Sequence, residues 1–305
     1  MKKFIAVLLI AAMTATAMIG CGSGNGGSGN ASSGNNTDNT DAGVKGLISV
    51  VSREEGSGTR GAFIELFGVE EKGADGKKVD HTTSEATIAN STEIVLSNVA
   101  GDPNAIGYVS LGSLKDTVKA LKINGVEATV ENIKSGSYEI SRPFNIATNG
   151  TPSEVTQDFI DYILSEEGQK VVEGKGYIQA VDAPKAYSGT KPAGKIRVEG
   201  SSSVTPVMEK LIEAYKAVNP NAEIELQPSD SSAGIQAAMD GTADIGMASR
   251  ELKDSETEQG LTATTIAMDG IAVVVNLDNP TANLTSDQVK GVYVGDVTSW
   301  DELAE

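Results

Sequence analysis

The chain has 305 residues, a formal net charge of −18, one histidine and one cysteine. Its negative charge argues against nucleic acid or anionic lipid as a partner, because an acidic surface repels both. One cysteine leaves no disulfide within the chain, and the sequence has no cluster of Cys and His for zinc. We therefore expect no metal site and no cofactor.

The first 20 residues have the pattern of a secretory signal. Two lysines precede an apolar run over 4–19, which is too short for a stable membrane span. The run ends in Met18-Ile19-Gly20-Cys21, which resembles the lipobox of bacterial lipoproteins, although Leu is usual where Met stands here. We predict that Cys21 carries a lipid anchor, with an ordinary buried cysteine as the alternative.

Residues 21–45 consist almost entirely of Gly, Ser, Asn, Thr and Asp. Such a segment buries too little apolar surface to offset its ordering entropy, so the composition predicts a flexible tether. The roughly 260 residues that follow exceed what one small core usually needs, which favours two lobes.

Beyond the tether, apolar β-branched runs alternate with helical patterns. The expected strands are Leu47–Ser52, Ile106–Leu111, Lys195–Glu199, Glu223–Leu226 and Ile271–Asn276. The expected helices include one stripe from Ser153 to about Glu173, one helix capped by Thr205, and one opened by a capping box of Thr285 and Gln288. This alternation predicts an α/β fold.

The first candidate site follows the first strand, in the segment SREEGSGTR over 52–60. Ser57, Gly58 and Thr59 stand where a strand gives way to a helix, so they offer hydroxyls, free backbone N–H groups and the positive end of a helix dipole to an anion. Arg53 can add a forked donor. No Walker A lysine is present, which disfavours a nucleotide P-loop. The alternative is a capped helix after a tight turn.

Two further junctions have the same character. GSSSVTP over 200–206 and SDSSAG over 229–234 each lie between an expected strand and an expected helix. In open α/β sheets such junctions gather at the carboxyl ends of the strands, where ligands bind. Three hydroxyl-rich junctions, one of them with an arginine, predict an anion site more strongly than any one of them alone.

The motifs resemble those of a known family. Segment 195–305, with GSSSVTP, DIGMASREL, AMDGIAVVVN and LTSDQVKGVYVGDVTSW, is similar to the amino-terminal part of the PstS-type phosphate-binding proteins of ABC transporters. Segment 47–182, with SVVSREEGSGTRGAF, AIGYVSLG, RPFNIATNG and SEEGQKVVEGKGYI, resembles the carboxyl-terminal part. The resemblance implies a type II periplasmic-binding-protein-like fold, two α/β lobes hinged around a cleft, and no enzymatic activity.

The two segments stand in the reverse of the family's order. We therefore expect a circular permutation, in which the Pro- and Gly-containing linker 183–194 joins the family's usual ends. One lobe would then combine 46–144 with 277–305, and the other would be 145–276. A fragment of a longer tandem arrangement is the alternative.

Carried over motif by motif, the resemblance implies inorganic phosphate as the ligand and a set of ligand residues from each lobe. These are Arg53, Ser57, Gly58 and Thr59 on one side, and Ser202, Ser203, Ser231 and Ser249 on the other. It also implies the permease subunits of an ABC importer as partners. The chain would act at the extracytoplasmic face of the cell membrane, anchored through Cys21.

Selectivity for phosphate calls for one more group. Phosphate keeps a proton near neutral pH and sulfate does not, so an acceptor carboxylate favours phosphate. Some family members have an aspartate where this sequence has Ser249. We predict that Asp269 supplies the acceptor, with a turn or cap aspartate as the alternative.

Other functions stay open from the sequence. The chain could be a receptor for sulfate, molybdate or tungstate, a surface phosphate sensor or adhesin, or a secreted phosphate-ester hydrolase with Ser57 as its nucleophile. The hydrolase would need a general base, and the single histidine, His81, stands in a polar stretch without partners.

Overall fold

The computed structural model describes residues 46–73 and 77–303. The predicted signal, the whole of the predicted tether and the predicted lipid site at Cys21 lie outside the described residues. As predicted, the described chain has an α/β fold, in which one mixed sheet of ten strands carries helices on its faces.

The large sheet has the strand order β11-β10-β12-β8-β13-β5-β1-β4, and β6 and β9 also pair with β13. Its strands are β1 (Ser49–Arg53), β4 (Thr87–Ala89), β5 (Ala105–Ser110), β6 (Val118–Ala120), β8 (Ser141–Asn149), β9 (Ile178–Gln179), β10 (Gly194–Ser201), β11 (Ala222–Ser229), β12 (Ile245–Ala248) and β13 (Leu261–Asn276). Two small sheets pair β2 (Glu70–Lys72) with β3 (Lys78–Asp80), and β7 (Lys122–Ile123) with β14 (Asn283–Leu284).

The helices fall between the strands, as the sequence pattern indicated. They are α1 (Gly58–Leu66), α2 (Thr92–Gly101), α3 (Val130–Lys134), α4 (Glu154–Ile163), α5 (Glu166–Gly174), α6 (Thr205–Val218), α7 (Ser231–Met239), α8 (Asp254–Thr257) and α9 (Ser286–Val294), with short 3₁₀ turns η1 (Leu111–Ser113) and η2 (Trp300–Glu302). Among the described residues, no helix has both the length and the apolar content that a membrane span needs.

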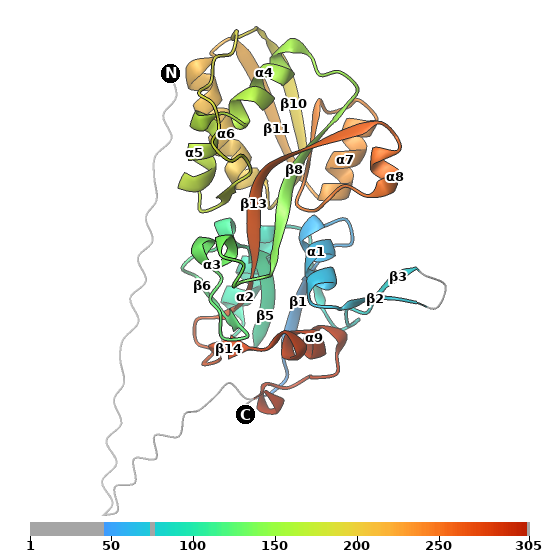
Figure 1. The fold of residues 1–305 in the computed structure, drawn as a ribbon. Helices are drawn as coiled ribbons and strands as arrows, with labels where there is room; N and C mark the ends of the chain where they lie inside the picture. Colours follow the sequence, from blue (N-terminus) through green and yellow to red (C-terminus); the bar gives the residue numbers. More distant parts are fainter. Residues whose placement is uncertain (1–45, 74–76, 304–305) are drawn as a thin grey trace, which may run out of the picture. The chain divides into compact units, whose positions relative to one another are not determined.

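The buried apolar side chains form separate cores for two lobes. Strands β8 and β13 lie side by side and run from one core into the other (Figure 1). At the start of β8, the core changes between Ile140, which directly precedes the strand, and Phe144; on β13, it changes between Ala267 and Ile271. We define the first lobe as the described residues of 46–140 and 271–303, and the second lobe as 144–267. The two crossings are 141–143 and 268–270.

The second crossing differs from the predicted boundary after residue 276. Strand β13 is one continuous strand of 16 residues, and Ile271, Val273 and Val275 pack into the first-lobe core. The apolar run Ile271–Asn276, which the sequence predicted as a strand, lies wholly in the first lobe, so the predicted boundary placed a first-lobe run in the second lobe.

Two expected helix details also differ. The stripe predicted as one helix is two, α4 and α5, because Ser165 starts a new helix by accepting a hydrogen bond from Gly168 N at 3.2 Å. Thr205 is not the cap of α6; Val204 holds that position, and the Thr205 hydroxyl donates to Ser201 O at 3.1 Å. The capping box of Thr285 and Gln288 at the start of α9 is confirmed.

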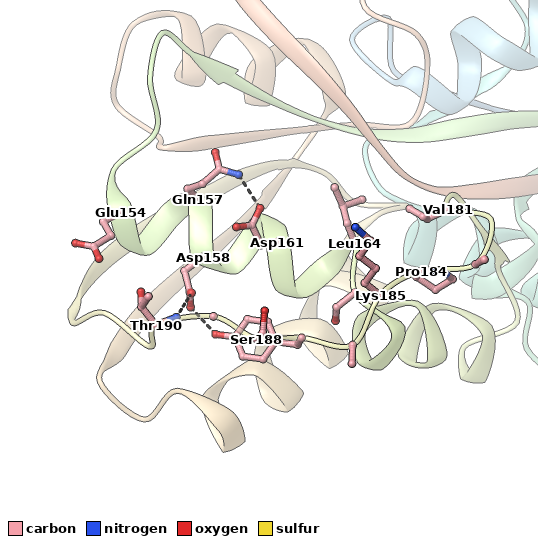
Figure 2. Close-up of a pocket in the computed structure, with 15 residues that line it drawn as sticks. Glu154, Gln157, Asp158, Asp161, Leu164, Val181, Pro184, Lys185, Ser188 and Thr190 are labelled. Carbon is pink, nitrogen blue, oxygen red and sulfur yellow. Dashed lines mark hydrogen bonds between the residues drawn. The ribbon is translucent and has the colours of Figure 1, made fainter.

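Residues 183–194, here called the strap, are fastened to the second lobe. The buried carboxylate of Asp158 on α4 accepts hydrogen bonds from Thr190 N at 3.0 Å and from the Tyr187 hydroxyl at 2.6 Å. Figure 2 shows Asp158 in contact with the strap, and residues of α4 and the strap line a surface pocket of about 810 Å³. None of the expected anion ligands lines this pocket, so the strap packs on a part of the second lobe that is separate from the expected site.

Candidate anion-binding site

Four chain segments that follow strands supply the expected ligands. Strand β1 leads into α1, β10 into α6 and β11 into α7, while Ser249 follows β12 directly. Strands β10 and β11 are parallel and in register, with Ser201 opposite Ser229. The hydroxyl-rich turns of the second lobe therefore lie at one edge of the sheet, as predicted.

The second lobe contributes a cluster of buried hydroxyls. The Ser201 hydroxyl donates to Ser249 Oγ at 2.9 Å, and Ser249 N donates to Ser231 Oγ at 3.1 Å. Ser202 N donates to Ser229 O at 2.9 Å, which joins the two turns. Ser231 and Ser249 are fully buried, so their remaining hydrogen-bonding capacity faces the interior of the protein.

The first lobe contributes the guanidinium of Arg53, which is 2% exposed. Its Nε and Nη2 donate to the two carboxylate oxygens of Glu54 at 2.8 and 2.7 Å. Its Nη2 also donates to Ser202 Oγ at 3.1 Å, across the two lobes. The bidentate ion pair fixes the plane of the guanidinium. In this plane Nη2 reaches Ser202 of the second lobe, while Nη1 donates to Thr92 Oγ1 of the first lobe at 3.3 Å.

The Ser57–Thr59 turn also contacts the second lobe. The Thr59 and Ser203 hydroxyls lie 2.8 Å apart and are hydrogen-bonded. At Gly58, a Cβ would lie 2.5 Å from Ser231 Oγ and 2.8 Å from Ser249 Oγ, so only glycine allows this approach. The Ser57 side chain is buried, and its Oγ accepts from Arg60 N at 3.3 Å as the cap of α1.

Three helices begin within this cluster. The first residues of α1, α2 and α7 are Gly58, Thr92 and Ser231, and each of these helices has nine or ten residues. Their positive dipole ends and the Arg53 guanidinium make the local environment favourable for an anion. A chain with a net charge of −18 can therefore still hold an anion at this place.

Thr92 was not among the residues predicted from the sequence. Its hydroxyl lies 3.1 Å from Ser203 Oγ and accepts from Arg53 Nη1 at 3.3 Å, and the residue is 3% exposed. The segment Asn90-Ser91-Thr92 after β4 is a fourth junction of strand and helix with hydroxyls. It lacks the glycine and the serine run that made the other junctions recognisable.

Asp269 lies outside this hydroxyl cluster. Its Oδ1 accepts from the Ser110 hydroxyl at 2.8 Å, and its Oδ2 accepts from Arg142 Nη2 at 3.1 Å. Burial raises the pKa of Asp269 to about 6, although Arg142 and Ser110 act to lower it. Both oxygens are engaged, one by Ser110 of the first lobe and one by Arg142 of the first crossing, so these contacts do not support the ligand role expected for Asp269.

A pocket of about 410 Å³ opens beside the cluster. It is lined by residues of both lobes, among them Ser57 and Arg60 from the first and Ser232, Arg250 and Lys253 from the second. Ser57 therefore lines an opening between the two lobes. Within residues 46–73 and 77–303, no three His, Cys, Asp or Glu side chains are grouped as a metal site requires.

Comparison with known proteins identifies the family. The family model described as the PBP superfamily domain matches residues 29–167 and 185–305. A protein called "Phosphate-binding protein PstS 2" from Streptococcus agalactiae serotype V is 58% identical over 270 residues, which cover 88% of this chain and 92% of that protein. The chain belongs to the PstS family of the PBP superfamily. This confirms the resemblance and the two-lobed fold.

Other members of the PstS family match to different extents. A crystal structure of a phosphate ABC transporter, phosphate-binding protein from Streptococcus pneumoniae TIGR4 has 49% identity and a TM-score of 0.67, and covers 84% of this chain and 99% of its own. The "Phosphate-binding protein PstS" of Bacillus subtilis is 33% identical over 137 residues, which cover 44% of this chain and 42% of that protein. Similarity therefore spans nearly the whole chain in one relative and less than half of it in another.

Proposed function

We propose that this chain is an extracytoplasmic receptor that binds inorganic phosphate between its lobes and delivers it to the permease of an ABC importer. One observation carries the proposal: Arg53 and the Ser57–Thr59 turn of the first lobe meet the serine turns of the second lobe in one buried cluster. The names of the most similar relatives, which are phosphate-binding proteins, support the choice of anion.

The chemistry of the cluster suits an enclosed tetrahedral oxyanion. Taking such an ion out of water is costly unless its oxygens receive hydrogen bonds in place of hydration. Hydroxyls of Ser202, Ser203, Ser231 and Ser249, backbone N–H groups at three helix starts, and the Arg53 guanidinium can supply them. Each half-site offers only part of this set, so binding favours closure of the lobes.

Calorimetric titration of residues 46–305 with phosphate, sulfate and molybdate tests the proposal. We expect saturable binding of one phosphate per chain, much weaker heats with the other two anions, and no release of phosphate from p-nitrophenyl phosphate. Absence of phosphate binding would contradict the proposal. Preference for sulfate or molybdate would assign a different oxyanion receptor, and ester hydrolysis would assign an enzyme.

We also propose that a lipid on Cys21 anchors the receptor to the membrane. The signal-like pattern of residues 1–20 and the lipobox-like segment before the cysteine support this. In the producing bacterium, Cys21→Ala is expected to abolish palmitate labelling and to move the protein from the membrane fraction to the soluble extracytoplasmic fraction. The phosphate Kd should stay unchanged. A variant that still sediments with membranes would contradict the anchor.

We further infer that the chain is a circular permutation of the more common PstS order. The two ends of the described chain lie together: Ile48 N donates to Thr298 O at 2.8 Å, and Trp300 N donates to Gly46 O at 3.1 Å. The match to the Bacillus subtilis relative covers less than half of either protein, as expected when a collinear alignment can hold only one of two exchanged segments.

Reordering the chain tests the permutation. A variant that runs from residue 190 to 303, then through a short Gly/Ser linker from 46 to 189, keeps both lobes and cuts only the strap. It is expected to fold and to bind phosphate within about tenfold of the original, because permutation succeeds where chain ends are close. A soluble variant that melts cooperatively but binds no phosphate would count against the inference.

A further inference from the structure

A buried ion pair marks the place where both crossing strands pass between the lobes. Arg142 of β8 stands directly opposite Asp269 of β13 in the antiparallel register. The side chains are 2% and 0% exposed, and Arg142 Nη2 donates to Asp269 Oδ2 at 3.1 Å. Since the apolar cores change lobes at 141–143 and 268–270, the pair is central to both crossings.

The pair is also bound to both lobes. The Ser110 hydroxyl at the end of β5, in the first lobe, donates to Asp269 Oδ1 at 2.8 Å. The Arg142 guanidinium lies 5.4 Å from the centre of the Phe144 ring, which belongs to the second-lobe core. Next to the pair, Gly112 of η1 contacts the ring of Tyr177 from the second lobe; a Cβ at Gly112 would lie 2.1 Å from Tyr177 Cζ.

A gain in folding stability alone does not explain why a buried ion pair occupies this position. Two charges removed from water repay their desolvation only with good geometry, and an apolar pair of similar size would often be equally stable. Here Arg142 Nη1 has no hydrogen-bond partner in the described structure, although the side chain is buried. Buried ionic groups can instead specify register, because any slip of the strands leaves both charges without a partner.

We propose that Arg142 and Asp269 form the pivot of the two lobes and position the two phosphate half-sites. By holding β8 and β13 in one register, the pair fixes how the Arg53 side of the cleft meets the serine turns. Both are positioning residues that act without touching the anion. This inference rests on the proposed function, because it gives the pivot a role in phosphate binding.

The neutral double variant Arg142→Gln/Asp269→Asn tests the pivot, since it removes both charges and keeps a polar side chain at each position. We expect a folded protein with a phosphate Kd at least tenfold higher. We also expect a smaller decrease in the radius of gyration at saturating phosphate, measured by small-angle scattering. The matched control is Asp158→Asn, another buried carboxylate, which holds the strap. It should lower the melting temperature and leave the phosphate Kd within about twofold.

The scattering measurement separates a pivot from a ligand. If Asp269 bound phosphate directly, its loss would raise the Kd, but saturating phosphate would still close the lobes fully. A double variant with an unchanged Kd and full closure would overturn the proposal. If the original protein does not bind phosphate, the proposed function fails and the pivot is not thereby contradicted. The same variants are then compared with the oxyanion that binds the original protein and closes its lobes.

A second pair of variants tests the pivot should the double variant not fold. Gly112→Ala places a methyl group against the Tyr177 ring and leaves both residues of the ion pair in the sequence. It is expected to weaken phosphate binding at least tenfold, and Gly112→Ala/Tyr177→Leu is expected to regain part of that loss by making room. Phosphate affinity that is unchanged in a folded Gly112→Ala protein would contradict the pivot.

Discussion

Replacing Arg53 with glutamine is expected to weaken phosphate binding at least a hundredfold. The guanidinium is the buried positive charge of the cluster and is held in a fixed plane by Glu54. The one guanidinium N–H that Glu54, Ser202 and Thr92 leave free can donate to an enclosed anion. Such a charge-assisted hydrogen bond is worth roughly 1.5–3 kcal/mol, and about 1.4 kcal/mol corresponds to a factor of ten. The variant also leaves the half-buried carboxylate of Glu54 next to an anion without its partner.

Titration calorimetry of three variants checks this expectation. Arg53→Lys should recover only part of the affinity, because lysine keeps the charge and loses the planar fork. Arg197→Gln serves as the matched control, since Arg197 is an arginine of β10 that is 53% exposed and pairs with Asp244. It should bind phosphate like the original. If the phosphate Kd of the Arg53→Gln protein stayed within fivefold of the original, Arg53 would not be a phosphate ligand.

The hydroxyl-rich turns could be predicted from the sequence because their chemistry is local. Gly58 and its neighbouring hydroxyls stand next to each other in the chain, and the change from strand to helix is indicated by the apolar pattern on either side. That these turns face each other in space follows from the sheet, whose parallel strands end at one edge.

The partners of the site residues could not be predicted, since they depend on distant contacts. Thr92 reaches Ser203 across 111 residues of sequence, and Arg142 reaches Asp269 across 127. A turn or cap was the alternative considered for Asp269, but β13 continues through this residue and Gly270. Gly270 allows close packing here: a Cβ at position 270 would lie 2.4 Å from Ile133 Cδ1 of α3, which would have to move aside.

The strap shows the same limit in a segment predicted as a linker. Its proline, glycine and small polar residues gave no sign of fixed structure. The structure nevertheless holds it, because Asp158 on α4 accepts hydrogen bonds from two of its residues and Asn219 Nδ2 donates to Pro192 O at 3.0 Å. Composition describes the intrinsic preference of a segment, whereas buried polar groups elsewhere in the fold decide whether it is pinned.

Gly58→Ala is expected to give opposite effects on stability and on binding. In the arrangement described here, the new Cβ would lie 2.5 Å from Ser231 Oγ, 2.8 Å from Ser249 Oγ and 3.0 Å from the Ser249 carbonyl carbon. The last of these is backbone and cannot rotate away, so the lobes could not close to their present contact. We expect the phosphate Kd to rise at least a hundredfold.

Without phosphate, the same variant should be as stable as the original or more stable. The clash is with the opposite lobe and is relieved when the lobes part, while alanine favours a helix by up to about 1 kcal/mol over glycine. Gly61→Ala, in the same helix, is the matched control, because its Cβ would have only Arg250 Cδ as a neighbour, at 4.0 Å. It should share the gain in melting temperature and keep the phosphate affinity. If Gly58→Ala bound phosphate as tightly as Gly61→Ala does, the two half-sites would not need to meet at Gly58, and closure over the anion would have to occur elsewhere.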